Sequence, residues 1–365
     1  MTTGDPRLAA FSRLLDSSST QGPLAFELMS TADARWRDAY AAGHRQPVGY
    51  APVHVAYQHA YFTALCPDYV PLDCLILWQG RPIGIWSMAY IGEPGKERFS
   101  SNLNGSSGVS APWISDDLPE KTSKAAARQW LTLLGHGAAT FGIDSLRLRC
   151  PPATGALSHW QRLAMELGAE LGGSHRASVD LNLSETDYHG RLRKSYKALI
   201  NSAKRLWQVG IDDTGCERSF RAFEALHLAV AGRRTRPESS WRLQYESILS
   251  GDAFAIYLRD PTEKLVGASL FNRSRDEVSY AVGVYDRKLF DRPLAHLSLY
   301  TAIAHARTHK AQTFILGERA YPNDAPAPSD KELRIAYFKE GFATEILLVP
   351  FLNILSHQLS EATKN

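Results

Sequence analysis

The chain has 365 residues, of which 44% are hydrophobic and 22% are charged, with 26 glycines and 19 prolines. This is the composition of a globular protein long enough for two domains, and it excludes collagen-like and largely disordered chains. The formal net charge of only +3 excludes strong attraction to nucleic acid or membrane through overall charge, so any basic site must be local.

The apolar stretches and the cysteines of the sequence indicate the cellular compartment in which we expect the protein. The late apolar run Ile346–Leu352 is far shorter than the about 20 residues of a membrane-spanning helix. Residues 1–15 include three charged side chains and no continuous apolar core, so we expect no signal peptide. The four cysteines are scattered and form no CxxC pair, which favours a reducing, cytoplasmic location. The chain also has no HExxH, GxGxxG, GxxxxGK[ST] or GxSxG motif.

The first half of the chain reads as strands followed by a helix and another strand. In chain order we expect a strand at Leu75–Trp78, a turn at Gln79–Pro82, a strand at Ile83–Tyr90, a loop or mobile lid at Ser100–Pro112, a helix at about 122–141 and a strand at Asp144–Cys150. Trp78 and Trp86 flank the turn, and we expect both to pack in the core or across the strands.

The second half repeats this order more clearly. We expect a strand at Ala177–Leu183, helices at about 184–207, 217–230 and from Pro237, strands at Ala253–Leu258, Leu265–Phe271 and Glu277–Val284, a helix from Pro293 to His309, a short strand at Thr313–Leu316, a helix from Ser329 to Lys339 and a last strand at Glu345–Leu352.

Three consecutive strands between helical segments resemble the GNAT acyltransferase fold. The first half fits the same order, and Gly84 lies in its strand as Gly267 does in the second half. We therefore expect a fold of the α/β class with a mixed, α+β type sheet, built as two tandem GNAT-like units at residues 1–175 and 176–365. The boundary falls where Leu171–Ser174 interrupts the pattern. Coincidental similarity between two α/β domains is the alternative.

Two basic segments are candidates for binding anions. Residues 191–205 hold six basic side chains and no acid, and Lys194 and Lys197 belong to this run. Such a helix suits phosphates of a nucleotide-linked substrate or of tRNA, although a solvated amphipathic helix has the same pattern. Arg233 and Arg236 follow the glycine that ends the next helix, where cations suit the helix dipole or form an anion clamp.

Several other residues are candidates for the chemistry. His227 and Trp241 flank the arginine loop, and Tyr280 and Tyr285 lie on the third strand of the group. CoA-using GNAT enzymes carry a Q/R-x-x-G-x-G/A loop after that strand, whose amides hold the pyrophosphate. Here residues 286–293 contain no glycine, and the corresponding first-half loop at 105–115 has Gly105 and Gly108 without a preceding basic residue at motif spacing.

Two motifs of the second half resemble the Fem family of aminoacyltransferases, which are relatives of GNAT enzymes. They are D-L-N-L-S from Asp180 with R-K-S-Y-K-A-L-I-N-S-A-K-R from Arg193, and F-K-x-G-F from Phe338. The segment from His227 further resembles a Fem-like subgroup found among bacterial surface-polysaccharide and glycan biosynthesis proteins. The resemblance covers about residues 177–345, and it implies that Lys194, Tyr196, Lys197 and Lys339 lie in functional motifs.

These observations predict a cytoplasmic acyltransferase with no permanently bound cofactor. It would move an acyl or aminoacyl group from aminoacyl-tRNA or acyl-CoA onto an amine of a nucleotide- or lipid-linked cell-surface glycan or peptidoglycan-type precursor. We expect Glu318 or His227 to accept the proton and Tyr280 to polarise the carbonyl group. The expected substrate-binding residues are Lys194, Tyr196, Lys197, Arg233, Arg236, Trp241, Tyr285, Lys331 and Lys339.

Two alternatives remain at this stage. The first is a GNAT N-acetyltransferase that holds acyl-CoA through an unusual loop, and the second is a non-catalytic GNAT-like binding module. We expect no metal site, because His296 and His305 lie nine residues apart, too far for a helical i, i+4 pair, and His54 and His59 lack a third ligand.

Overall fold

The chain folds as two compact units. The computed structural model describes residues 5–93, 95–101, 103, 108–114, 118–153 and 155–360. The first unit comprises residues 1–45, 58–173 and 349–365, and the second comprises 46–57 and 174–348. A single cut at 175/176 therefore differs from these units in three segments: residues 46–57 and 174–175 belong with the second unit and residues 349–365 with the first.

The two units divide at 173/174, inside the predicted boundary segment Leu171–Ser174, but the chain forms a continuous strand there. This strand, β10 (Glu170–Asp180), contains residues of both units. Its Gly172 has a packing reason, since a Cβ atom there would lie 2.2 Å from the ring of Phe351. Gly172 thus allows a large ring to lie against the strand.

The first unit contains the hairpin, the long helix and the following strand expected from the sequence. Its elements are α1 (Pro6–Gln21), β1 (Leu24–Leu28), α2 (Ala34–Ala42), most of α3 (Pro52–Leu65), β2 (Tyr69–Pro71), β3 (Cys74–Trp78), β4 (Arg81–Trp86), β5 (Ala89–Ile91), β6 (Arg98–Ser100), β7 (Val109–Ser110), β8 (Trp113–Ile114), α4 (Glu120–Thr140), β9 (Ser145–Arg149), α5 (His159–Glu166), the end of β16 (Glu345–Leu355) and α12 (Ser356–Ser360).

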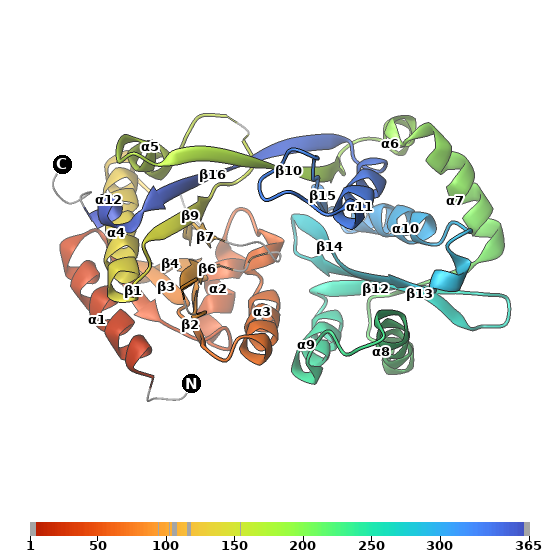
Figure 1. The fold of residues 1–365 in the computed structure, drawn as a ribbon, viewed down its shortest axis with the longest axis horizontal. Coiled ribbons are helices and arrows are strands. Elements are labelled where there is room, and N and C mark those ends of the chain that lie inside the picture. The colour runs from red at the N-terminus through yellow and green to blue at the C-terminus, as the bar shows by residue number, and fades with distance from the viewer. Residues whose placement is uncertain are drawn as a thin grey trace. The chain divides into compact units, whose positions relative to one another are not determined.

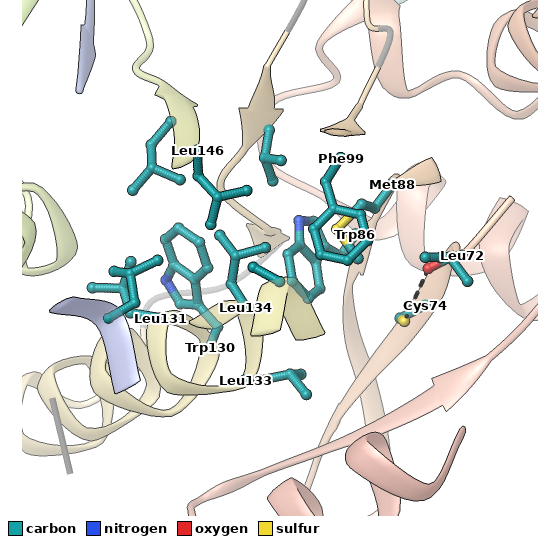
Figure 2. Packing of buried hydrophobic residues seen from close by; sticks show 14 of the residues in the cluster. Leu72, Cys74, Trp86, Met88, Phe99, Trp130, Leu131, Leu133, Leu134 and Leu146 are labelled. Carbon is teal, nitrogen blue, oxygen red and sulfur yellow. Dashed lines mark hydrogen bonds between the residues drawn. The ribbon is translucent and has the colours of Figure 1, made fainter. Parts of the chain in front are cut away.

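Three groups of strands surround the core of this unit. Their orders are β1-β3-β4-β8, β2-β5-β6 and β16-β9-β7. Gln79 and Gly80 both have positive φ (53° and 76°), as a two-residue hairpin between β3 and β4 requires. The Trp86 and Trp130 rings meet edge to face with centroids 5.9 Å apart. Figure 2 shows both rings among leucines of the core. Trp86 is fully buried and Trp78 packs against the cluster, so the packing role predicted for both is confirmed.

The expected lid at Ser100–Pro112 is partly a core element. Val109 is fully buried, and β7 pairs in parallel with β9. Gly105 and most of its neighbours lie outside the described residues, so the expectation for that part stays untested. Since α4 connects β7 to β9, this unit contains the strand–helix–parallel strand arrangement that the second unit also has.

The second unit contains the clearer version of the same order. Its elements are η1 (Val48–Tyr50), the start of α3, the end of β10, α6 (Glu185–Arg191), α7 (Lys194–Leu206), β11 (Gln208–Asp212), α8 (Glu217–Ala231), α9 (Glu238–Leu249), β12 (Ala253–Arg259), β13 (Leu265–Arg273), β14 (Glu277–Tyr285), η3 (Arg287–Leu289), α10 (Ala295–Thr308), β15 (Thr313–Glu318), α11 (Asp330–Glu340) and the start of β16.

The sheet of this unit has helices on both faces. Its strand order is β11-β12-β13-β14-β15-β10, and only β14 and β15 run parallel. One face packs against α7 and α10 around Phe254, Phe271 and Phe314, and the other packs against α8 and α9 around Phe220 and Phe223. Figure 1 shows α8 and α9 on the side of the strands opposite α10. This arrangement confirms the predicted mixed α/β class.

The helix expected at 184–207 is two helices. Ser184 caps the first by accepting a hydrogen bond from the Asp187 amide, as expected. Leu192 and Arg193 then adopt extended ψ values of 139° and 129°, which end α6 and start α7 in a new direction. Leu192 is buried in the core and the Arg193 amide donates to the Gly341 carbonyl, so tertiary contacts override the helical pattern at this point.

Residues 46–57 are held by buried carboxylates of the second unit. The Asp276 and Glu277 side chains accept hydrogen bonds from the Gln46 and Val48 amides, at 2.7 and 3.0 Å. His54 contacts the Asp252 carbonyl through Nε2 at 3.1 Å, and burial lowers the pKa of His54 to about 4. No pattern in the local sequence predicts this attachment.

The two Fem-like motifs of the sequence pack on each other. The Tyr196 ring lies 4.9 Å from the Phe342 ring, and the Tyr196 hydroxyl donates to the Phe338 carbonyl at 2.9 Å. Gly341 allows this contact, since a Cβ atom there would lie 2.3 Å from the tyrosine ring. The contact therefore couples the start of α7 to the end of α11.

All four cysteines are free thiols, and Cys74 and Cys150 are buried. Among the residues that the structure describes, no helix has both the length and the apolar content needed to cross a bilayer.

Replacing Gly341 with alanine should destabilise the protein by about 1–3 kcal/mol, because the added methyl group overlaps the buried Tyr196 ring. Chemical or thermal denaturation measures this. The matched control is Gly210→Ala, where a Cβ atom meets nothing within 4 Å. Equal stability of the two variants would contradict the packing argument.

Candidate functional site

Strands β14 and β15 pair over only three residues each. The parallel register joins Glu277 to Thr313, Val278 to Phe314 and Ser279 to Ile315, and no further pairs follow. Tyr280 in β14 and Gly317 in β15 lie beyond these pairs, where β14 and β15 no longer pair with each other. We call this point the β14–β15 fork.

Each strand has an extra residue next to the fork. The register with β13 jumps from Leu270–Val282 to Phe271–Tyr280, which leaves Ala281 as a β-bulge. The register of β15 with β10 jumps in the same way and leaves Leu316 unpaired. A bulge changes which face of the sheet the following side chains meet. Accordingly, Tyr280 packs with the α10 face, whereas Val282 packs with the α8 face.

Tyr280 is fixed beside the bulge. Its ring stacks on Phe271 with centroids 5.4 Å apart, and its hydroxyl occupies the space where a Cβ atom of Gly283 would lie, only 1.8 Å away. Burial, reinforced by the neighbouring Tyr285, raises the pKa of Tyr280 well above its ordinary value. The hydroxyl therefore stays protonated and is able to donate a hydrogen bond at neutral pH.

A chain of hydroxyl groups lies next to this ring. The Tyr285 hydroxyl is 2.7 Å from the Ser269 hydroxyl, and Ser298 at the start of α10 donates to Ser269 at 3.0 Å. Burial also raises the pKa of Tyr285. The three side chains connect β13, β14 and α10 through polar contacts inside an otherwise apolar layer.

Lys339 of α11 is a largely buried cation at the fork. Its ammonium lies 5.2 Å from the centre of the Tyr280 ring, and a Cβ atom at Gly317 would approach Nζ to 2.7 Å. Among the described residues the ammonium has no hydrogen bond and no ion pair. Burial lowers the pKa of Lys339 to about 8, and the charge of Glu318 partly opposes this shift. Within the described part of the chain, the cation thus faces the fork without a bound counterion.

Glu318 lies at the exposed end of β15 and is free to act on Lys339. The guanidinium of the neighbouring Arg319 pairs with Glu340 at 2.9 Å and not with Glu318. Within the described part of the chain, Glu318 accepts no side-chain hydrogen bond. The negative charge of its carboxylate raises the pKa of Lys339.

Residues 286–293 form a tight turn. The Asp286 side chain accepts from the Lys288 amide and caps the short helix η3. The Pro293 carbonyl accepts a hydrogen bond from the Trp207 indole at 3.3 Å. With Trp207 holding its end, the loop differs from a flexible glycine loop wrapped around a pyrophosphate.

His227, Arg236 and Trp241 form a second group, where α8 meets α9. Arg236 donates from Nη1 to His227 Nε2 at 2.8 Å and from Nε to the Tyr57 hydroxyl at 3.2 Å, and it lies over the Trp241 ring. Burial, and then the Arg236 charge, lower the pKa of His227. Because an arginine only donates, His227 Nε2 is occupied as an acceptor and the proton lies on Nδ1. This geometry does not favour His227 as a proton acceptor.

A pocket of about 290 Å³ lies between α8 and α9. It is lined by the aromatic rings of Phe220, Trp241 and Tyr245 and by glutamates and arginines of both helices. None of the lining residues belongs to β14, β15 or α11, so the pocket is separate from the fork. Arg233 is exposed on the nearby turn after Gly232, which ends α8 with φ of 69°.

The remaining predicted residues lie on α7 and α11. Tyr196 is buried against Phe338 and Phe342, which gives it a packing role. Lys194 and Lys331 are exposed and Lys197 is half-buried. Of all the predicted site residues, the structure brings together four at the fork and three where α8 meets α9: Tyr280, Tyr285, Glu318 and Lys339 in the first group, and His227, Arg236 and Trp241 in the second.

Sequence reasoning missed the residues that shape the fork. Gly317 has a φ of 121°, which favours glycine, and Gly283 leaves room for a tyrosine hydroxyl. A glycine inside each of two neighbouring strands was the available signal, because a strand glycine often marks close approach by another group.

Comparisons with known proteins were made with sequence and with structure. No protein-family model and no curated protein matches the sequence. A crystal structure of FemX superposes with a TM-score of 0.63 at 11% identity, covering 93% of this chain and 100% of that one. The C-terminal domain of a putative lysylphosphatidylglycerol synthetase from Agrobacterium fabrum gives 0.54 at 12% identity, covering 91% and 94%.

A tandem GNAT protein from the clavulanic acid biosynthesis pathway gives a TM-score of 0.50 at 14% identity and covers 91% of this chain and 98% of that one. At these identities the likeness concerns the fold. The chain therefore has the fold of FemX and of tandem GNAT proteins, with two GNAT-like units in one polypeptide, as the order of its elements predicted.

Proposed function

We propose that the chain is an acyltransferase that moves an acyl or aminoacyl group onto an amine of a nucleotide- or lipid-linked glycan or peptidoglycan-type precursor. The observation that carries this proposal is Lys339, a largely buried ammonium with no counterion among the described residues, placed beside Tyr280 at the fork. A site that keeps such a cation out of water is suited to a substrate that develops negative charge.

The proposed reaction takes place at a carbonyl carbon. The amine attacks the carbon, and the carbonyl oxygen becomes an oxyanion. The oxyanion then re-forms the carbonyl as the carbon–oxygen or carbon–sulfur bond breaks, and the tRNA or CoA leaves with a proton taken up on its oxygen or sulfur. The Lys339 ammonium and the Tyr280 hydroxyl stabilise the oxyanion, since both are protonated at neutral pH. Glu318 accepts the proton that the amine loses, and its charge keeps Lys339 protonated. All of these groups come from the protein, and the acyl donor binds as a cosubstrate.

Aminoacyl-tRNA is the donor that the surface favours. Six basic residues follow one another from the end of α6 along α7 without an acid between them. Arg193 lies 3.9 Å from Glu340, and the other five are Arg191, Lys194, Lys197, Lys204 and Arg205. We call them the α7 basic surface. A cluster of this kind neutralises a phosphate backbone. Acyl-CoA is the alternative donor, and the tight, glycine-free turn at 286–293 argues against it.

The direct test incubates the purified chain with charged tRNA or with acyl-CoA, together with amino-sugar nucleotides and peptidoglycan-type precursors as acceptors. Mass spectrometry detects the added acyl group. Transfer from charged tRNA supports the proposal. Transfer from acyl-CoA alone would identify acyl-CoA, and not aminoacyl-tRNA, as the donor. Binding of a precursor without transfer from either donor would favour a non-catalytic binding module.

Replacing Lys339 with methionine should lower the turnover number by about 10²–10³ while making the fold more stable. The stem of the side chain is preserved, and the buried charge that costs about 3 kcal/mol below pH 8 is removed. Because the folded-state pKa lies below the unfolded one, the stability gain is largest below pH 8 and disappears as the pH approaches 10.5.

The control for this variant is Arg334→Met, which removes an exposed cation from the same helix and should change neither property. Steady-state kinetics and denaturation curves at pH 7 and pH 10 measure the two effects. A Lys339→Met protein with full activity would exclude the lysine from the mechanism, and a destabilised one would indicate a structural role.

The charge of Glu318 should be visible in the pH dependence of the reaction. We expect the ratio of wild-type to Lys339→Met turnover to fall as the pH rises through about 8, because Lys339 loses its proton there. In Glu318→Gln the fall should begin at lower pH, since the carboxylate that raises the lysine pKa is gone. Glu345→Gln, at another exposed strand end, is the control. An unchanged midpoint in Glu318→Gln would refute this coupling.

Reversing two charges of the α7 basic surface tests the donor. Lys194→Glu with Lys197→Glu should weaken binding of charged tRNA and reduce the slope of log affinity against log salt by about one for each phosphate that is no longer neutralised. Fluorescence anisotropy at several salt concentrations measures both. Unchanged affinity and slope would show that the α7 basic surface does not bind the tRNA.

A further inference from the structure

Two histidines of α10 lie next to an aspartate from a distant part of the second unit. His305 and His309 are four residues apart, so their side chains lie on one face of the helix end. Their Nε2 atoms are 3.1 Å apart, and the Asp213 Oδ2 atom is 3.7 Å from His305 Nε2. Potential ligand atoms of all three residues lie within 4.8 Å of one another.

These distances are close to those of a metal site. In a tetrahedral Zn²⁺ site with bonds of about 2.0–2.1 Å, neighbouring ligand atoms lie about 3.3 Å apart. The observed values of 3.1 and 3.7 Å lie on either side of this separation. Bringing Asp213 into place requires a small movement of a half-exposed side chain.

The hydrogen bonding of the two histidines is unsatisfactory without a cation. Arg273 donates from Nη1 to His309 Nε2 at 3.1 Å, so this nitrogen offers a lone pair. His305 Nε2 approaches the same nitrogen to the same distance. If His305 Nε2 is protonated, two donors compete for one lone pair, and if it is not, two lone pairs face each other. A cation between the nitrogens resolves the conflict, since Arg273 keeps two hydrogen bonds to the Gly251 carbonyl.

The surroundings hold the three side chains ready. The His305 ring packs edge-on against Phe254, with centroids 4.7 Å apart. Asp213 lies in a loop that Asp212 fixes by accepting hydrogen bonds from the Gly215 and Cys216 amides. Burial is the main cause that lowers the pKa of both histidines, so both rings are neutral at neutral pH. Neutral imidazole is the form that binds metals.

We propose that Asp213, His305 and His309 form a binding site for a divalent transition metal such as Zn²⁺, with water completing the coordination. The site joins the loop after β11 to the end of α10, and it is separate from the chemistry proposed at the fork. Imidazole ligands favour Zn²⁺, Co²⁺ and Ni²⁺ over Mg²⁺ and Ca²⁺. The nearby Arg273 charge reduces the affinity, and its Nη1 group must leave His309 Nε2 when the ion binds.

Titration of the tag-free, chelator-treated full chain with Zn²⁺ tests this proposal by calorimetry. We expect one ion per chain, a rise in melting temperature with Zn²⁺, and no response to Mg²⁺. His309→Gln and Asp213→Asn, both at accessible side chains, should each weaken binding by about tenfold or more and abolish the shift in melting temperature. His136→Gln, on an exposed helix position of the first unit, is the control and should behave as wild type.

Binding of Co²⁺ provides a second readout, because Co²⁺ held in a four-coordinate site by two imidazoles, a carboxylate and water absorbs visible light much more strongly than hydrated, loosely bound Co²⁺. This band should disappear in His305→Ala if that variant retains the wild-type circular dichroism spectrum. The proposal is overturned if the chain binds no Zn²⁺, or if His309→Gln and Asp213→Asn bind it as tightly as the His136→Gln control.

Discussion

The short pairing between β14 and β15 is the constraint on which the rest of the proposed site depends. Three paired residues hold the strands together, and an extra residue in each strand marks where pairing ends. The bulge at Ala281 allows Tyr280 and Val282 to pack on opposite faces of the sheet. If β14 and β15 continued to pair, their facing backbone N–H and C=O groups would be hydrogen-bonded to each other at this point. The site therefore arises where the pairing of β14 with β15 ends.

The position of Lys339 has an energetic cost that the fold must offset. A lysine with a pKa of about 8 destabilises the folded state by about 3 kcal/mol while it is charged, a large share of the stability of a typical domain. The aromatic face of Tyr280 and the charge of Glu318 compensate only in part. Packing of Phe338 in α11 and of Phe342 just after it keeps the helix in place despite this cost. Such a balance is typical of a group retained for its chemistry.

The order of the elements was predictable from the sequence because it depends on local patterns, such as the capping box that begins α11. What the sequence did not predict depends on distant contacts. The helix break at Leu192 follows from burial, and the attachment of residues 46–57 depends on carboxylates far along the chain. The same holds for the candidate residues. The i, i+4 spacing of His305 and His309 was a signal in the sequence for the proposed metal site, whereas the approach of Asp213, from a loop much earlier in the chain, was not predictable.

The presence of both Fem-like motifs in this chain has a physical explanation, because the two motifs pack on each other. Tyr196 from the first motif packs on Phe338 and Phe342 from the second, and Gly341 makes room for the tyrosine ring. The lysine between those two phenylalanines, Lys339, is the one that reaches the fork. A motif was enough to identify this lysine, but its burial depends on strands that the motif does not include. The motifs thus act as one packing unit: the aromatic residues determine where α11 lies, and that position determines where the ammonium is placed.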